Sequence, residues 1–290
     1  MFCIGCAGSV QNGNQNGSKD STATASQLDP SHSALVKVNN RLFNVPSPLQ
    51  LAGIFKKFNL PYRNEMLNSV GKRSDYTTSF KQALNVGVYG CDLGYINVYE
   101  QLPDAAQYFA AIRSLTTELG ILNSFSEQTM KRIEDNNGDK DSLLYIASII
   151  YRESDSYLMN SERNEIGALI IAGGWVEGLY FLTHLQSIDD MDAGLFQIIG
   201  QQKRPLDNLI ELLRPYYNKL NPAYDEFLEK LSDVANIYED ITVNYTYKAS
   251  ETDDVNKITI INSESTVSIN KAQVKHIAEK IAEIRADITK

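Results

Sequence analysis

Apolar residues recur at helical spacing along most of this chain and change to a strand pattern near its end. Between residues 45 and 239 they return every three or four positions, and proline, glycine or cap residues separate the runs. The predicted helices cover residues 46–58, 76–100, 103–119, 141–158, 162–186, 189–213 (with a break at Pro205) and 221–238. This pattern predicts a mainly α protein, built as a multi-helix bundle over residues 34–240.

After residue 240 polar and apolar residues alternate, which is typical of β-strands. The predicted strands are 241–247, 257–261 and 266–269, with an acidic loop at 249–256 and a tight turn at 262–265. Asn270 then caps an amphipathic helix that carries Val274, Ile277, Ile281 and Ile288 on one side. We expect residues 241–290 to form a small antiparallel β-meander and a terminal helix packed on the helical domain.

Two predicted helices, residues 83–99 and 167–185, are apolar nearly all round and are therefore expected at the centre of the bundle. Each contains glycines four residues apart, Gly90 and Gly94 in the first and Gly174 and Gly178 in the second. Glycine inside a helix costs about 1 kcal/mol relative to alanine. Several glycines in one helix therefore indicate close backbone approach, and we expect the two helices to cross near them.

Each central helix also carries one acid among its apolar residues, Asp92 in the first and Glu177 in the second. A buried carboxylate must find a partner or take up a proton. One interpretation gives both acids structural partners, such as tyrosine hydroxyls, helix-end amides or an arginine from elsewhere. The other is a ligand or proton-linked site that also includes Tyr95, on the first helix, and His184, on the same helical face as Glu177.

No pattern in the sequence assigns a catalytic residue, a metal site or a cofactor. The serines at 154, 156 and 161 lack a nucleophile-elbow setting, and the three histidines are scattered. The acidic run 135–141 does not fit the calcium-binding EF-hand frame, and the central helices contain no Glu-x-x-His pair. The balance of these observations is against an enzyme.

Charge limits the choice of partners. The chain has 290 residues, 27 basic and 36 acidic, with a formal net charge of −9 and no window rich in lysine or arginine. Phosphate neutralisation needs a basic face, so we expect no nucleic-acid partner. Binding of the protein surface to anionic membrane is disfavoured for the same reason.

The N-terminal residues resemble the end of a bacterial lipoprotein signal. In Cys3-Ile4-Gly5-Cys6 a small residue precedes a cysteine with apolar neighbours. The resemblance implies that residues 1–6 are a signal remnant and that Cys6 is acylated and becomes the mature N-terminus. Of residues 7–33, 17 are Gly, Ser, Asn, Gln or Thr, so we expect a flexible tether.

A wider resemblance rests on residues 76–95, which contain Tyr89-Gly90-Cys91-Asp92-Leu93-Gly94, and on residues 172–180, Ala-Gly-Gly-Trp-Val-Glu-Gly-Leu-Tyr. These segments look like a family of uncharacterised helical lipoproteins of Bacteroidota, over most of residues 45–290. The resemblance implies an envelope location and no established activity. Cys91 departs from it, because a small residue such as alanine is expected there.

These observations favour a lipid-anchored helical protein of the bacterial cell envelope, anchored to the outer membrane and facing the periplasm. It would contact the membrane through its N-terminal lipid and bind or scaffold a protein or small-molecule partner. One alternative is a small-molecule receptor or enzyme that uses Asp92 and Glu177. Another is a tetratricopeptide-like adaptor, through Leu93-Gly94 and Ala106, although no 34-residue period supports it.

Overall fold

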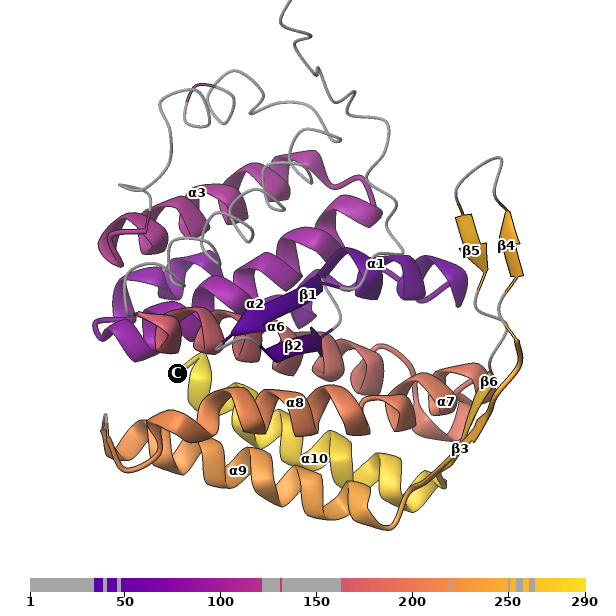
Figure 1. Ribbon diagram of the computed structural model, residues 1–290. Coiled ribbons are helices and arrows are strands. Elements are labelled where there is room, and N and C mark those ends of the chain that lie inside the picture. Colours follow the sequence, from indigo (N-terminus) through magenta and orange to yellow (C-terminus); the bar gives the residue numbers. More distant parts are fainter. Residues whose placement is uncertain are drawn as a thin grey trace, which may run out of the picture.

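α-Helices make up most of the part of the chain that the structure describes (Figure 1). The computed structural model describes residues 34–38, 41–45, 48–121, 131, 163–219, 221–249, 251–253, 258–260 and 264–290. Within them the helices are α1 (Pro48–Lys57), α2 (Ser79–Val98), α3 (Leu102–Glu118), α6 (Asn164–His184), α7 (Ala193–Gln201), α8 (Lys203–Leu213), α9 (Pro222–Glu239) and α10 (Lys271–Ile288). The mainly α prediction is confirmed. The predicted signal remnant, the tether, the acidic run at 135–141 and the helix at 141–158 lie outside the described residues.

Cap residues explain where the helices begin and end. The Thr78 hydroxyl accepts a hydrogen bond from the Lys81 N–H at 3.2 Å at the start of α2. Asn270 and Gln273 form a reciprocal capping box at the start of α10. After α3, Gly120 adopts a positive φ of 73°, which glycine reaches without strain.

Helix α6 lies between α1–α3 on one side and α8–α10 on the other (Figure 1). It is long and apolar enough to cross a membrane, but 83% of its most apolar window is buried inside the protein. Its contacts with α2 advance in the same direction along both helices, from Leu84 with Gly173 to Tyr95 with Phe181. The two helices therefore run parallel. The chain after α2 must run back along the molecule before α6 begins.

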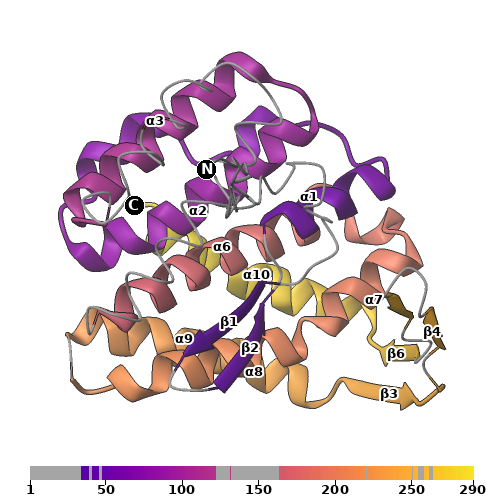
Figure 2. The same ribbon diagram turned by 45° about the horizontal axis from the view of Figure 1, so that its top comes forward.

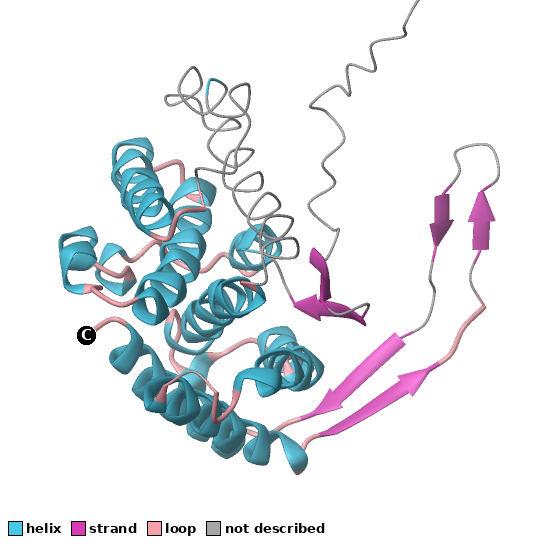
Figure 3. Cartoon of the chain, turned by 60° about the vertical axis from the view of Figure 1, so that its left-hand side comes forward, coloured by secondary structure: helices cyan, strands magenta, loops and turns pink. Residues whose placement is uncertain are grey.

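The strands after α9 form nested hairpins. Strand β3 (Thr242–Thr246) pairs antiparallel with β6 (Glu264–Ser268), and β4 (Glu251–Asp253) pairs antiparallel with β5 (Ile258–Ile260). Figure 3 shows this ribbon extending away from the helices. The predicted small antiparallel sheet followed by a terminal helix is confirmed. The strand pairing differs from that of a simple meander, because β3 pairs with β6 and β4 pairs with β5. Part of the predicted acidic loop is strand β4.

A hairpin at the start of the described chain was not predicted. Strand β1 (Ala34–Val38) pairs antiparallel with β2 (Arg41–Val45), in a region expected to belong to a purely helical domain. Only Asn39 and Asn40 separate the two strands, and a two-residue connection is typical of tight hairpins. The hairpin lies beside α8 (Figure 2).

The closest contact between α2 and α6 is made by backbone. A Cβ atom at Gly87 would lie 2.0 Å from the Ile170 carbonyl oxygen and 2.6 Å from the Gly174 nitrogen. A Cβ atom at Gly173 would lie 1.9 Å from the Leu84 oxygen. The expected close approach exists, and Gly174 of the predicted pairs takes part in it through its backbone nitrogen. Gly87 and Gly173, where a Cβ atom would collide with backbone, were not in the predicted pairs. Gly90, Gly94 and Gly178 are buried along the same two helices.

We expect Gly87→Ala to lower the free energy of unfolding by at least about 3 kcal/mol, the upper end for overpacking, since backbone atoms cannot move aside. Gly53→Ala is the control, because a Cβ there, on α1, meets nothing within 4 Å. It should leave stability unchanged or raise it by up to about 1 kcal/mol through helix propensity. Urea denaturation followed by circular dichroism measures both variants. Equal stabilities would contradict the close helix contact.

Candidate functional site

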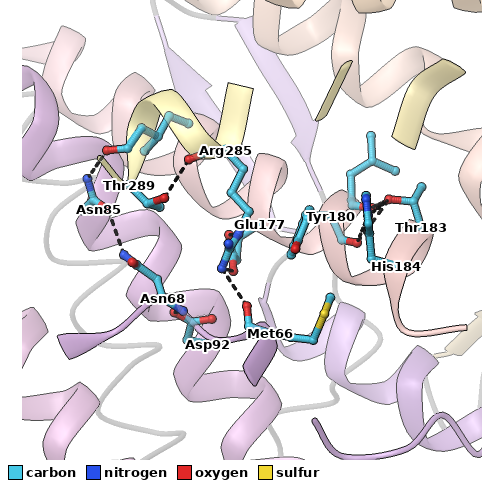
Figure 4. A network of polar contacts seen from close by, with 12 residues as sticks. Met66, Asn68, Asn85, Asp92, Glu177, Tyr180, Thr183, His184, Arg285 and Thr289 are labelled. Carbon is cyan, nitrogen blue, oxygen red and sulfur yellow. Dashed lines mark hydrogen bonds and ion pairs between the residues drawn. The ribbon is translucent and has the colours of Figure 1, made fainter. Parts of the chain in front are cut away.

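Asp92 and Glu177 lie at the contact between α2 and α6, and each has 0% solvent exposure. The parallel course of the two helices brings the two carboxyl groups together, so that each changes the pKa of the other. Figure 4 shows them in one cluster with Arg285 of α10. The structure therefore joins two acids that the sequence identified separately.

Arg285 holds Glu177 through both carboxylate oxygens. Its Nε donates to Oε2 at 2.6 Å, and its Nη2 donates to Oε1 at 2.7 Å. Nη2 also donates to the Met66 carbonyl oxygen at 2.7 Å, and the guanidinium lies 4.2 Å from the centre of the Tyr180 ring. Two-point pairing of this kind is among the strongest hydrogen bonding in proteins. It satisfies Glu177 in its ionised form.

Asp92 is bonded less completely than Glu177. Its Oδ2 accepts a hydrogen bond from the Asn68 N–H at 3.2 Å. Its Oδ1 is buried, and no donor among the described residues reaches it. Burial raises the pKa of the Asp92 carboxyl well above its usual range, the charge of Glu177 raises it further, and Arg285 only partly opposes both.

Asn68 connects Asp92 to three helices. Its Nδ2 donates to the Asn85 Oδ1 of α2 at 3.1 Å and to the Tyr76 hydroxyl at 3.0 Å. Its carbonyl oxygen accepts from the Tyr108 hydroxyl of α3 at 2.9 Å. Asn85 in turn donates to the Ile288 carbonyl of α10 at 3.0 Å. The hydrogen bonds of Asn68 and Asn85 thus join Asp92 to α3 and to the end of α10 in one network.

The Tyr95 hydroxyl forms hydrogen bonds with the segment between α1 and α2 and not with the two acids. Its hydroxyl accepts from the Arg63 N–H and donates to the Pro61 carbonyl, both at 2.8 Å. Tyr99 donates to the Leu60 carbonyl, and Tyr89 donates to the Ser69 carbonyl at 2.9 Å. Burial raises the pKa of Tyr95. The tyrosines of α2 therefore act as hydrogen-bond partners for the backbone of residues 60–69.

His184 lies near the end of α6, on the other side of Tyr180 from Arg285 (Figure 4). Its Nδ1 is 3.0 Å from the Tyr180 carbonyl oxygen and 2.9 Å from the Thr183 hydroxyl, and its ring stacks on Tyr180 with 4.3 Å between the centres. Burial lowers the pKa of His184, so the ring is neutral at pH 7. His184 and Glu177 share a helix face, but Tyr180 and Arg285 lie between them.

Arg285 and Asn68 are the main members of the network that the sequence analysis missed. Arg285 had a detectable signal: it lies four residues after Ile281 and three before Ile288, on the apolar stripe of the last helix. A charge at such a position is expected to be buried and therefore paired. Asn68 had no detectable signal in the sequence, because it lies outside any segment with periodic apolar residues.

One cavity lined by described residues lies apart from these groups. It is an open hollow of about 520 Å³ at the surface between α9 and α10. Its lining residues are Asn236, Ile237, Asp240, Asn270, Ala272, Gln273 and His276. Among the described residues no group of three or more His, Cys, Asp or Glu side chains could hold a metal ion. Cys91 is buried with a free thiol.

Comparison with known proteins adds no family. No family model, no curated protein and no solved structure matches this chain.

We expect Arg285→Met to lower the free energy of unfolding by about 3–5 kcal/mol, because it leaves the Glu177 charge buried without its partner. Lys280→Met, on the same helix, is the matched control. Lys280 pairs with Glu283 at the surface, so its loss should change stability little. Chemical denaturation of both variants gives the comparison. An Arg285→Met protein as stable as the Lys280→Met protein would contradict the importance of the ion pair.

Proposed function

We propose that this chain is a lipid-anchored, mainly helical protein of the bacterial cell envelope that binds or scaffolds a partner and has no catalysis of its own. The lipoprotein-like Cys3-Ile4-Gly5-Cys6 and the polar residues 7–33 support the anchor and its tether. The resemblance to helical lipoproteins of Bacteroidota supports a location in the cell envelope, and Ala7 after Cys6 is compatible with sorting to the outer membrane. Membrane contact would be made through the lipid on Cys6.

The proposal that the protein has no catalysis of its own rests on the hydrogen bonding of the two buried acids. Both carboxylate oxygens of Glu177 accept hydrogen bonds from Arg285, and one oxygen of Asp92 accepts a hydrogen bond from the Asn68 backbone N–H. Both side chains are fully buried, away from the described cavity. General acid–base catalysis requires a carboxyl group within reach of a substrate. These acids instead serve the protein's own interior.

The competing class is a small-molecule receptor or enzyme built on Asp92 and Glu177. It would need both carboxyl groups at a shared, open pocket with tyrosine hydroxyls converging on it. The bonding of Tyr95 and Tyr99 to backbone carbonyls does not favour it. A tetratricopeptide-like adaptor would stack helical hairpins around a concave face. The burial of α6 between two groups of helices favours a globular bundle instead.

The anchor is tested by Cys6→Ala in a precursor that carries a functional signal sequence. We expect the unaltered protein to partition into detergent and its N-terminal peptide to carry acyl mass, whereas Cys6→Ala should be soluble. Cys3→Ala is the control, because the resemblance places Cys3 in the removed segment, and this variant should remain in the membrane fraction. A membrane-bound Cys6→Ala protein without acyl mass would contradict the lipoprotein proposal.

A further inference from the structure

The buried cluster at the centre of the protein contains more acids than bases. Two carboxyl groups, Asp92 and Glu177, share one guanidinium, Arg285. The ion pair joins α6 to α10, and the same guanidinium binds the Met66 carbonyl. Asp92 binds the neighbouring Asn68 N–H. The cluster thus fastens the C-terminal helix and residues 66–68 to the central helices.

The other titratable groups near Asp92 add no compensating charge. The titratable and charged groups that face it are Glu177 of α6, Arg285 of α10, Tyr108 of α3, Tyr89 and Cys91 of α2, and Tyr62 and Tyr76 of the segment between α1 and α2. Burial raises the pKa of each of these tyrosines, for Tyr62 to about 12, and that of the Cys91 thiol. All five are therefore neutral at pH 7.

With both acids ionised, the cluster would carry one uncompensated negative charge in the interior. Such a charge is costly, and a buried acid avoids it by keeping its proton. Burial raises the pKa of the Glu177 carboxyl as well, but Arg285 donates to both of its oxygens and so favours ionisation there. Asp92 receives one backbone N–H, and its Oδ1 accepts nothing from the described residues. A proton on Asp92 makes that carboxyl a donor toward Glu177 and leaves the cluster neutral.

We propose that Asp92 holds a proton in the folded protein at neutral pH, and that this proton makes the attachment of α10 and residues 66–68 to the core sensitive to alkaline pH. Loss of the proton would place two carboxylates beside one guanidinium. The resulting repulsion would be relieved by loosening the contacts of Arg285 or Asn68.

The sign of the pH dependence follows from proton binding. In the unfolded chain Asp92 loses its proton near its ordinary pKa of about 3.9, whereas the folded protein keeps it to higher pH. Between these two values the folded state binds one more proton than the unfolded state. The contribution of Asp92 to stability therefore falls as pH rises, and the folding equilibrium constant falls by up to about tenfold per pH unit. The folding equilibrium constant stops falling for this reason at pH values above the pKa of Asp92 in the folded protein.

The test compares the full-length protein with Asp92→Asn in urea denaturation at pH values from 5 to about 9. Asparagine keeps the shape, can accept from the Asn68 N–H and can donate to Glu177 without a proton to lose. We expect the variant to bind about one proton fewer than the unaltered protein in its folded state, and to gain stability relative to it as pH rises. Asp190→Asn, at an exposed position, is the control and should follow the unaltered protein.

Parallel pH profiles for Asp92→Asn and the unaltered protein would overturn the proposal, and so would a variant that loses relative stability as pH rises. If Asp92→Asn does not fold, a measurement on the unaltered protein still tests whether Asp92 is protonated. Carbon-13 NMR of aspartate-labelled protein should show one carboxyl group that stays protonated at pH 7 and is slow to exchange with solvent. A spectrum in which every aspartate is ionised at pH 7 would also overturn the proposal.

Discussion

The irregular segment of residues 60–69 must find hydrogen-bond partners inside the protein, and much of the polar interior meets that need. Peptide groups that face the core cannot stay unpaired without a cost of about 1–3 kcal/mol each. Tyrosines of α2 and α3 reach the carbonyls of Leu60, Pro61, Asn68 and Ser69. Arg285 and Asp92 complete the set at Met66 and Asn68. The buried tyrosines and charges thus support this segment and connect it to α10.

The same network gives the bundle a definite arrangement as well as stability. Apolar faces alone tolerate sliding and rotation, because dispersion contacts have little direction. The two hydrogen bonds between Arg285 and Glu177 form in this placement of α10 on α6, and a shift of either helix would break them. Backbone contact at Gly87 and Gly173 similarly fixes how α2 meets α6. The polar cluster lies only about one turn further along the same interface, so steric and electrostatic constraints act on one pair of helices.

Local signals in the sequence were sufficient for most of the described helices. The break predicted at Pro205 was wrong, because it lies at Gln202 and Pro205 stands in the first turn of α8, where proline is tolerated. Thr78, Asn221 and Asn270 mark helix starts, and apolar stripes identify the buried faces. Partnerships between distant segments were harder, since alternation identifies a strand but does not choose between pairing β6 with β5 or with β3. Asp92 and Glu177 stood out as lone acids in apolar helices. Their proximity, and the choice of Gly87 over Gly90, depend on how two helices are rotated, which no single helix reveals.

The C-terminal position of α10 has a consequence for biosynthesis. Arg285 meets Glu177 and Met66 across 108 and 219 residues of sequence, and the Ile288 carbonyl binds Asn85 across 203. A chain that emerges from its N-terminus completes these contacts only after residues 285–288 have been synthesised. Until then Glu177 has no counter-charge, and the apolar sides of α2 and α6 lack part of their cover. The nascent polypeptide therefore passes through a long interval in which aggregation is favoured and a chaperone would be useful.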